Sequence, residues 1–130
     1  MTTSGRWIHL TSAWLFAGGV LVQAYLVGQA LTQLDGSGDF GAHRAIGYSV
    51  MGLLALVVLV AAIIGRLPRR HVSLTLLLFV LYIVRTALPN ARSSAPDFAA
   101  LHPANAMLML VLAVAIGWRA RRIRPADRIV

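Results

Sequence analysis

The sequence predicts an all-α integral membrane protein, an antiparallel bundle of four transmembrane helices built from two helical hairpins. The chain is 58% hydrophobic with a mean hydropathy of +0.75, and only 12% of its residues are charged. Soluble domains are roughly 45–50% apolar, so a soluble chain of this size could not cover its surface with polar groups. Four long apolar runs and the arginines that flank them complete the pattern.

Each apolar run is close to the length of about 20 residues that a helix needs to cross a bilayer. We expect helices over residues 7–34, 42–65, 72–88 and 101–118, followed by a basic tail over residues 119–130. Helix is the expected state because each backbone amide can then bond within its own segment, away from water. The connections are short, so consecutive helices run in opposite directions and form a single domain.

The arginines predict the orientation of the bundle in the membrane. One set falls on one side of the predicted helices: Arg6, Arg66, Arg69, Arg70, Arg119, Arg121, Arg122, Arg124 and Arg128. The positive-inside rule then places both termini on the cytoplasmic side of a bacterial inner membrane. The net charge of +8 therefore indicates topology and contact with anionic lipid, and not nucleic acid.

Several kinds of chemistry are excluded by the residues that are missing. Cysteine is absent, which excludes disulfides, thiolate metal sites and thiol nucleophiles. Glutamate is absent too, and the four aspartates all lie outside the apolar runs: Asp35, Asp39, Asp97 and Asp127. No buried acid–base pair is available.

One short pattern occurs twice, just before the second and the fourth apolar run. Asp39-Phe40 is followed by His43, and Asp97-Phe98 by His102. Each aspartate is expected to cap the start of its helix, since a carboxylate accepts the unpaired amide hydrogens there. A parallel repeat implies a pseudo-twofold axis along the membrane normal, which places His43 opposite His102 near the outer face.

Two facing imidazoles predict a haem b site, because haem iron accepts one imidazole from each of two helices in a bundle. Gly47 and Ala106 each lie four residues after a ligand, on the same helical face, and would leave space for the porphyrin. The alternative is that His43 and His102 are interfacial residues that cap helix starts or reach the headgroups.

Arg85 lies within the third apolar run, where a charged group needs an anion. No carboxylate lies in the runs, so haem propionates would pair with Arg85, with Arg44 as a helper. The alternative is that Arg85 reaches outward to the lipid headgroups.

His9 and His71 open the first and third helices on the inner side. They would form a second diagonal pair, and a second haem there would complete an electron path across the bilayer. Alternatively, His71 is solvated beside the preceding arginines and His9 anchors at the interface. Binding of one haem is expected in preference to binding of two.

Other polar and sulfur-containing residues in the runs have supporting roles. The first helix has a polar series, of which the last three members recur at i, i+4 and i+8 on one face: Gln23, Tyr25, Gln29 and Gln33. Hydrogen bonding between helices is expected of these residues and of Tyr48, Tyr82 and Asn105. The alternative is a hydrogen bond to a propionate or to a quinone headgroup. The methionines in the cores of the runs are expected to fill space, although their sulfurs could in principle bind iron: Met51, Met107 and Met109.

The residues Ala42-His43-Arg44, with His102 in the fourth helix, resemble one half of haem A synthase. In that family the haem-ligating histidines open the second and fourth helices of a four-helix bundle. It has a catalytic glutamate where Phe40 stands here, so the resemblance implies ligand roles and not the synthase activity.

The arrangement of His9/His71 and His43/His102 also resembles the core of the ascorbate-reducible cytochromes b, where alternate helices hold two haems. The segments 43–48 and 102–106 further resemble a family of small four-helix membrane proteins without assigned function.

The sequence thus favours a cytochrome-like protein for transmembrane electron transfer or haem handling. Its expected partners are the lipid bilayer and a quinol or redox protein, and it would be an electron-transfer component of a membrane oxidoreductase. The alternative is an apo accessory subunit, which packs in a homo-oligomer or a larger membrane complex.

Overall fold

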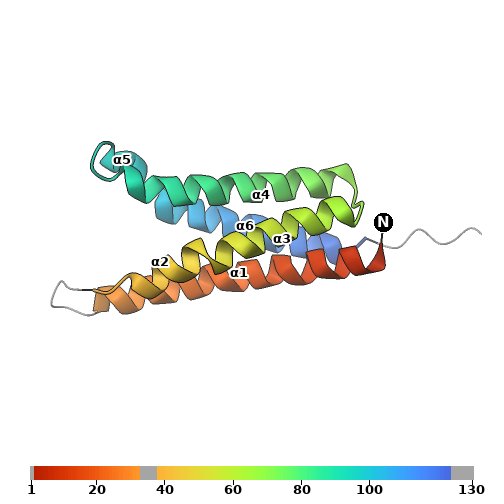
Figure 1. Ribbon diagram of the computed structural model, residues 1–130, viewed down its shortest axis with the longest axis horizontal. Coiled ribbons are helices and arrows are strands. Elements are labelled where there is room, and N and C mark those ends of the chain that lie inside the picture. Colours follow the sequence, from red (N-terminus) through yellow and green to blue (C-terminus); the bar gives the residue numbers. More distant parts are fainter. Residues whose placement is uncertain (1, 33–37, 124–130) are drawn as a thin grey trace, which may run out of the picture.

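The computed structural model describes residues 2–32 and 38–123. Seven helical elements follow one another in Figure 1: α1 (Thr3–Thr32), α2 (Gly41–Tyr48), α3 (Val50–Ile64), α4 (Arg69–Ala87), the 3-10 helix η1 (Leu88–Ala91), α5 (Pro96–Ala99) and α6 (His102–Arg121). No strand occurs in this part of the chain. The predicted all-α architecture is confirmed.

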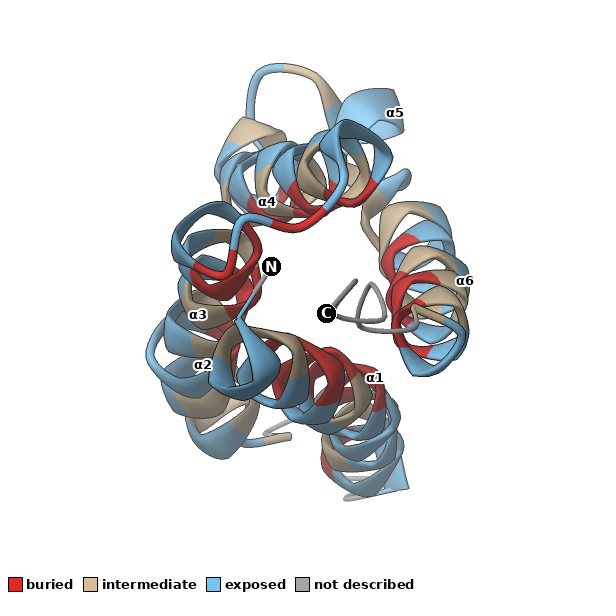
Figure 2. Cartoon of the chain, turned by 90° about the vertical axis from the view of Figure 1, so that its right-hand side faces the viewer, coloured by how far each residue is buried: buried red, intermediate tan, exposed pale blue. Residues whose placement is uncertain are grey.

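The long helices lie along a common axis as a four-membered bundle (Figure 1). α1 packs against α3 and α6, and α4 packs against the same two helices. α1 and α4 are therefore diagonal to each other, as are the α2–α3 segment and α6. Buried residues face the middle of the bundle on all of its helices (Figure 2).

The two diagonals carry matching patterns of buried residues. All five buried positions of α4 have a buried counterpart 62 residues earlier in α1: His9/His71, Ala13/Thr75, Phe16/Leu78, Val20/Tyr82 and Gln23/Arg85. Their spacing alternates between four and three residues, which is the spacing of a helix seam in a bundle. α3 and α6 repeat in the same way: Met51/Met109, Ala55/Ala113, Val58/Ile116 and Ala62/Ala120.

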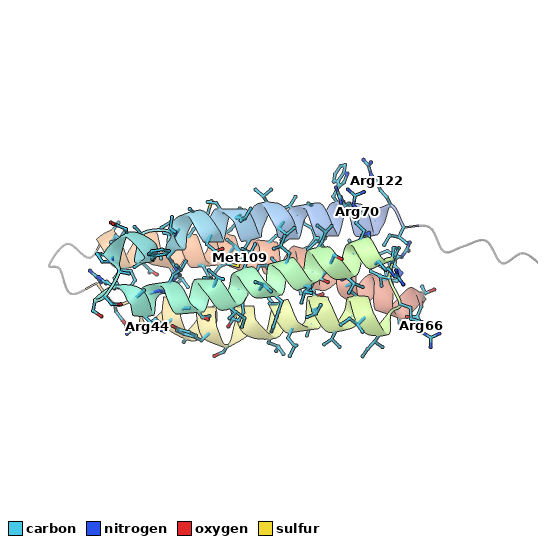
Figure 3. All side chains as sticks on the ribbon, turned by 90° about the horizontal axis from the view of Figure 1, so that it is seen from above. Arg44, Arg66, Arg70, Met109 and Arg122 are labelled. Carbon is cyan, nitrogen blue, oxygen red and sulfur yellow. The ribbon has the colours of Figure 1, made fainter. Side chains whose placement is uncertain are left out.

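Four segments are long and apolar enough to cross a membrane, by length and composition: 3–32, 41–64, 69–91 and 96–121. Large apolar side chains on them point away from the bundle, among them Leu21, Leu53, Leu77 and Val111. Four candidate membrane-spanning helices of this kind are typical of a multi-pass membrane protein. Figure 3 shows three of the arginines, Arg66, Arg70 and Arg122, at one end of the bundle.

The second predicted helix is interrupted. A continuous helix over residues 42–65 was expected, but α2 ends at Tyr48 and α3 begins at Val50, with a turn at Ser49 between them. The repeat supplies the physical reason: eight positions separate His43 from Met51, whereas seven separate His102 from Met109. The interruption accommodates the extra residue.

The two aspartates do not cap their helices alike. Asp39 Oδ1 accepts a hydrogen bond of 2.6 Å from the Gly41 amide, the first of α2, although Phe40 holds the cap position. Asp97 instead lies inside the short helix α5, and α6 begins at His102 behind Leu101 without a side-chain cap. The expected cap by Asp97 is therefore wrong.

The ends of the predicted helices also differ from the structure. α1 begins four residues earlier than expected, and its predicted last residues, 33 and 34, lie outside the described residues. α6 extends to Arg121, so the first part of the expected basic tail is helical.

The start of α1 and the end of α3 meet backbone to backbone. The Thr2 amide donates to the Gly65 carbonyl at 3.0 Å. A Cβ atom built on Gly5 would overlap the Cα atom of Gly65, whereas one built on Gly18 would have nothing within 4 Å. Of these two glycines, only Gly5 is required by packing.

Two glycine-to-alanine variants of α1 test this close approach. Gly5→Ala should destabilise the protein by about 1–3 kcal/mol, the usual cost of overpacking. Gly18→Ala should raise stability by up to about 1 kcal/mol, because alanine is the better helix former. Thermal unfolding in detergent, followed by circular dichroism, measures both. Equal melting temperatures for the two variants would contradict the contact.

Candidate functional site

The four histidines of the chain lie in two pairs, one toward each end of the bundle. His43 of α2 and His102 of α6 have ring centroids 6.2 Å apart, with an angle of 70° between the ring planes. His9 of α1 and His71 of α4 have centroids 5.7 Å apart, at 73°. Each pair joins helices that are diagonal in the bundle, as the sequence predicts. We call the two ends the His43 end and the His9 end.

Backbone carbonyls of neighbouring helices orient both rings at the His43 end. His43 Nδ1 lies 3.3 Å from the carbonyl oxygen of Gln23, and His102 Nδ1 lies 3.2 Å from that of Arg85. A carbonyl can only accept, so Nδ1 carries the proton in both rings and Nε2 holds the free electron pair. Metal-binding histidines are commonly oriented by such a bond from the second ring nitrogen.

A cavity of about 270 Å³ is lined by both rings. Its wall is mostly apolar and draws on every long segment of the bundle: Val20, Gln23, Ala24, Val27, His43, Met51, Arg85, His102, Pro103, Ala104, Ala106, Met107 and Met109. Exposed residues of α1 and α6, such as Ala24 and Met107, are part of this wall. The cavity therefore opens between these two helices, toward the surroundings of the bundle.

Arg85 points into the bundle, and not toward the headgroups. It is only 6% exposed. Nη1 donates to the Gly47 carbonyl and Nη2 donates to Gln23 Oε1, each at 3.2 Å. Both acceptors are neutral, and no ion pair joins Arg85 to a carboxylate among the described residues. The guanidinium thus brings a positive charge to the cavity wall without a countercharge.

The interruption at Ser49 is part of this site. Tyr82 donates a hydrogen bond of 2.9 Å to the Tyr48 carbonyl, next to the Gly47 carbonyl that Arg85 uses. α4 therefore contributes two side chains that bond to the last carbonyls of α2. These bonds connect the irregular backbone to the bundle core.

The small residues beside the ligands have different surroundings. Ala106 lines the cavity. Gly47 was expected to leave room for a porphyrin, but a Cβ atom there would lie 3.0 Å from Arg85 Nη2. The space beside Gly47 therefore accommodates the arginine.

Arg44, the expected helper of Arg85, is exposed and does not line the cavity. Figure 3 shows it at the end of the bundle opposite Arg66 and Arg122. The structure therefore does not bring Arg44 to the site.

The polar residues of the first helix divide into two groups. Gln23 is buried and bonds to α4, as expected of a residue that joins helices. Tyr25, at 67% exposure, and Gln29 face away from the bundle. Helical spacing separates the two groups, because Tyr25, Gln29 and Gln33 recur at i, i+4 and i+8 on one face and Gln23 does not belong to that series. Gln33 itself lies outside the described residues.

Backbone acceptors are the part of the site that sequence reasoning missed. The carbonyls of Gln23, Gly47 and Arg85 hold His43, Arg85 and His102 in place. Side-chain patterns carry no signal for such partners. Among the described residues, no group of three or more histidine and acidic side chains could hold a metal ion, so a metal here would depend on the two imidazoles.

Removing the Gln23 amide should leave a buried charged donor without its acceptor. We expect Gln23→Leu to lower the free energy of unfolding by about 1–3 kcal/mol. The matched control is Gln29→Leu on the same helix, which is exposed and should change little. Denaturation in mild detergent measures both. A Gln23→Leu variant as stable as the wild type would show that this bond does not hold Arg85.

Comparison with known proteins gives one match. Residues 23–91, just over half of the chain, match the model of a family of unknown function (DUF6220). The matched segment includes His43, His71 and Arg85. No curated protein and no solved structure matches the chain, and no resemblance to haem A synthase or to the cytochromes b is shown. The chain belongs to the DUF6220 family, whose function is unknown.

Proposed function

We propose that the protein binds haem b between His43 and His102 and acts in transmembrane electron transfer or haem handling. The observation that carries the proposal is the pair of imidazoles on diagonal helices, with centroids 6.2 Å apart and each Nδ1 atom held by a carbonyl. In both rings Nε2 has no partner among the described residues. Two oriented donors of this kind suit a metal that binds imidazole from opposite sides.

The spacing of the rings fits such a metal. Two metal–nitrogen bonds of about 2.0–2.1 Å and two ring radii of roughly 1.1 Å give a centroid separation of about 6.2–6.4 Å. The separation of His43 and His102 is 6.2 Å. The angle between the ring planes does not enter this comparison, because the centroid separation is the same for any rotation of a ring about its metal–nitrogen bond.

The wall of the cavity is mostly apolar, which suits the apolar body of a macrocycle. Its volume of about 270 Å³ lies just below the range of about 300–1,000 Å³ that is usual for ligand pockets. Met51, Met107 and Met109 line it. Methionine side chains are unbranched and flexible, so they can move to widen the cavity.

Polar donors on the cavity wall fit the propionates. Arg85 has no countercharge there, and Gln23 Nε2 is buried without an acceptor. A propionate would accept from both side chains and neutralise the guanidinium, which is costly to bury alone. The protein would supply ligands, burial and charge, whereas haem, when bound, supplies a one-electron redox centre.

The positive-inside rule places the His43 end at the outer face of a bacterial inner membrane, since Arg66, Arg70 and Arg122 gather at the other end (Figure 3). A quinol from the bilayer or a redox protein outside would then be the partner of this site.

Absorption spectra test the haem proposal directly. Full-length protein, expressed with ample haem and purified in detergent, should show a sharp Soret band and, after reduction with dithionite, resolved α and β bands. A pyridine haemochrome assay measures the stoichiometry. A featureless spectrum would instead favour an apo accessory subunit of a larger membrane complex.

Single substitutions test the ligands. His43→Ala and His102→Ala should each remove the low-spin spectrum of this site while the protein remains in the membrane. Arg44→Gln is the matched control, because Arg44 follows His43 but lies outside the cavity wall, and should retain the spectrum. Unchanged spectra in both histidine variants would overturn the assignment.

The absence of cysteine makes the orientation simple to measure. Ser94→Cys and Ser4→Cys each introduce one thiol at an exposed position, at the His43 end and the His9 end respectively. A membrane-impermeant maleimide should label Ser94→Cys in intact spheroplasts and Ser4→Cys only after lysis. The reverse pattern would contradict the orientation.

A further inference from the structure

The second histidine pair is more deeply buried than the first. His9 is 0% exposed and His71 is 7% exposed, and their ring centroids lie 5.7 Å apart. Neither residue is solvated or anchored at the bundle surface, which the sequence left open as an alternative. Both rings instead lie inside the bundle, at the His9 end.

Each ring of this pair has a nitrogen atom that lacks a partner. His9 Nδ1 lies 3.0 Å from the Val58 carbonyl oxygen, and therefore carries the proton, but His9 Nε2 is buried without a hydrogen bond. His71 Nδ1 is also buried without one. A buried polar atom left unpaired costs about 1–3 kcal/mol. The next buried polar residue toward the His43 end is Ser12 in α1 and Thr75 in α4. Both of these hydroxyls bond back to their own helices.

The surroundings leave few candidates for a partner. The buried positions of α3 and α6 toward this end are apolar, among them Val58, Ala62, Ile116 and Ala120. The charged groups near His71 are the cations Arg70 and Arg119, which cannot accept a hydrogen bond. No described carboxylate lies there to accept a proton from a charged imidazole. Each ring can therefore offer an unshared electron pair on a nitrogen atom that has no hydrogen-bond partner. Two such imidazole nitrogens can bind one metal.

We propose that His9 and His71 form a second metal site, in which one imidazole from each hairpin binds the same metal. The metal class is one that accepts imidazole ligands, such as iron or copper. It is held either as the iron of a second haem or as a bare ion. The centroid separation of 5.7 Å is slightly below the value of about 6.2–6.4 Å for two collinear ligands, so the rings approach the metal at a bend or move apart by a few tenths of an ångström.

This second site is independent of the first and lies far from it. Gln23, whose carbonyl orients His43, follows His9 by fourteen residues on the same straight helix. At a rise of about 1.5 Å per residue the two levels are about 21 Å apart. The molecule would then hold one metal centre near each face of a hydrocarbon core of about 30 Å.

Variants that remove one pair at a time separate the two proposals. In the variant His43→Ala/His102→Ala, full-length protein loaded with haemin, or with Cu⁺ or Zn²⁺ under anaerobic conditions, should keep one metal centre per chain. Adding His9→Gln should remove that centre, because glutamine still donates to the Val58 carbonyl but is a poor metal ligand. His71→Gln should do the same and is the second variant if the first does not fold.

Two assays distinguish the occupants. One haem per chain by pyridine haemochrome identifies a second haem, and one equivalent of metal without haem identifies a bare ion. No bound haem, copper or zinc in the His43→Ala/His102→Ala variant would overturn the proposal, as would binding that His9→Gln and His71→Gln leave unchanged. Neither result decides the proposal for His43 and His102, which the absorption spectra of the wild type and of the single variants test separately.

Discussion

Polar side chains in an apolar bundle need acceptors, and here backbone carbonyls provide most of them, either in the same helix or in a neighbouring one. Six such bonds cross between helices among the described residues: His9 to Val58, His43 to Gln23, Tyr82 to Tyr48, Arg85 to Gly47, His102 to Arg85 and Asn105 to Leu81. Apolar packing in a bilayer discriminates weakly between registers, because lipid tails are as apolar as the helices. These bonds are directional and therefore fix how far each helix is shifted along its neighbours.

The same bonds place the chemistry of the molecule. Gln23 and Arg85 occupy equivalent positions of the repeat, and each uses its carbonyl to orient the histidine of the following helix. Their side chains then bond to each other near the axis of the bundle. Gln23 and Arg85 therefore orient both rings at the His43 end through their carbonyls, and Arg85 also supplies the positive charge there. A substitution at either position would affect ligand orientation and electrostatics together.

The sequence contains the layout of this molecule but not its local irregularities. Apolar runs and a repeated histidine were enough to predict four helices and both histidine pairs, because the repeat and the antiparallel order determine which helices are diagonal. The break at Ser49 accompanies the extra residue between His43 and Met51, whereas the short helix that contains Asp97 has no counterpart among the described residues of the first half, so the repeat carries no signal for it. The inward direction of Arg85 depended on Gln23, 62 residues away in the sequence, and periodicity within one helix carries no information about such a partner.

The twofold pattern has a consequence for the unit that folds and functions. Each hairpin contributes one histidine to each pair, so neither half of the chain contains a complete pair by itself. A single hairpin of this kind would acquire both pairs at once by associating in parallel with a second copy, with the two pairs on the symmetry axis. Joining two copies in one chain then frees the halves to diverge, so that one carries Gln23 and the other Arg85 at the same position. The asymmetry of charge at the His43 end is something that a homodimer of identical hairpins could not have.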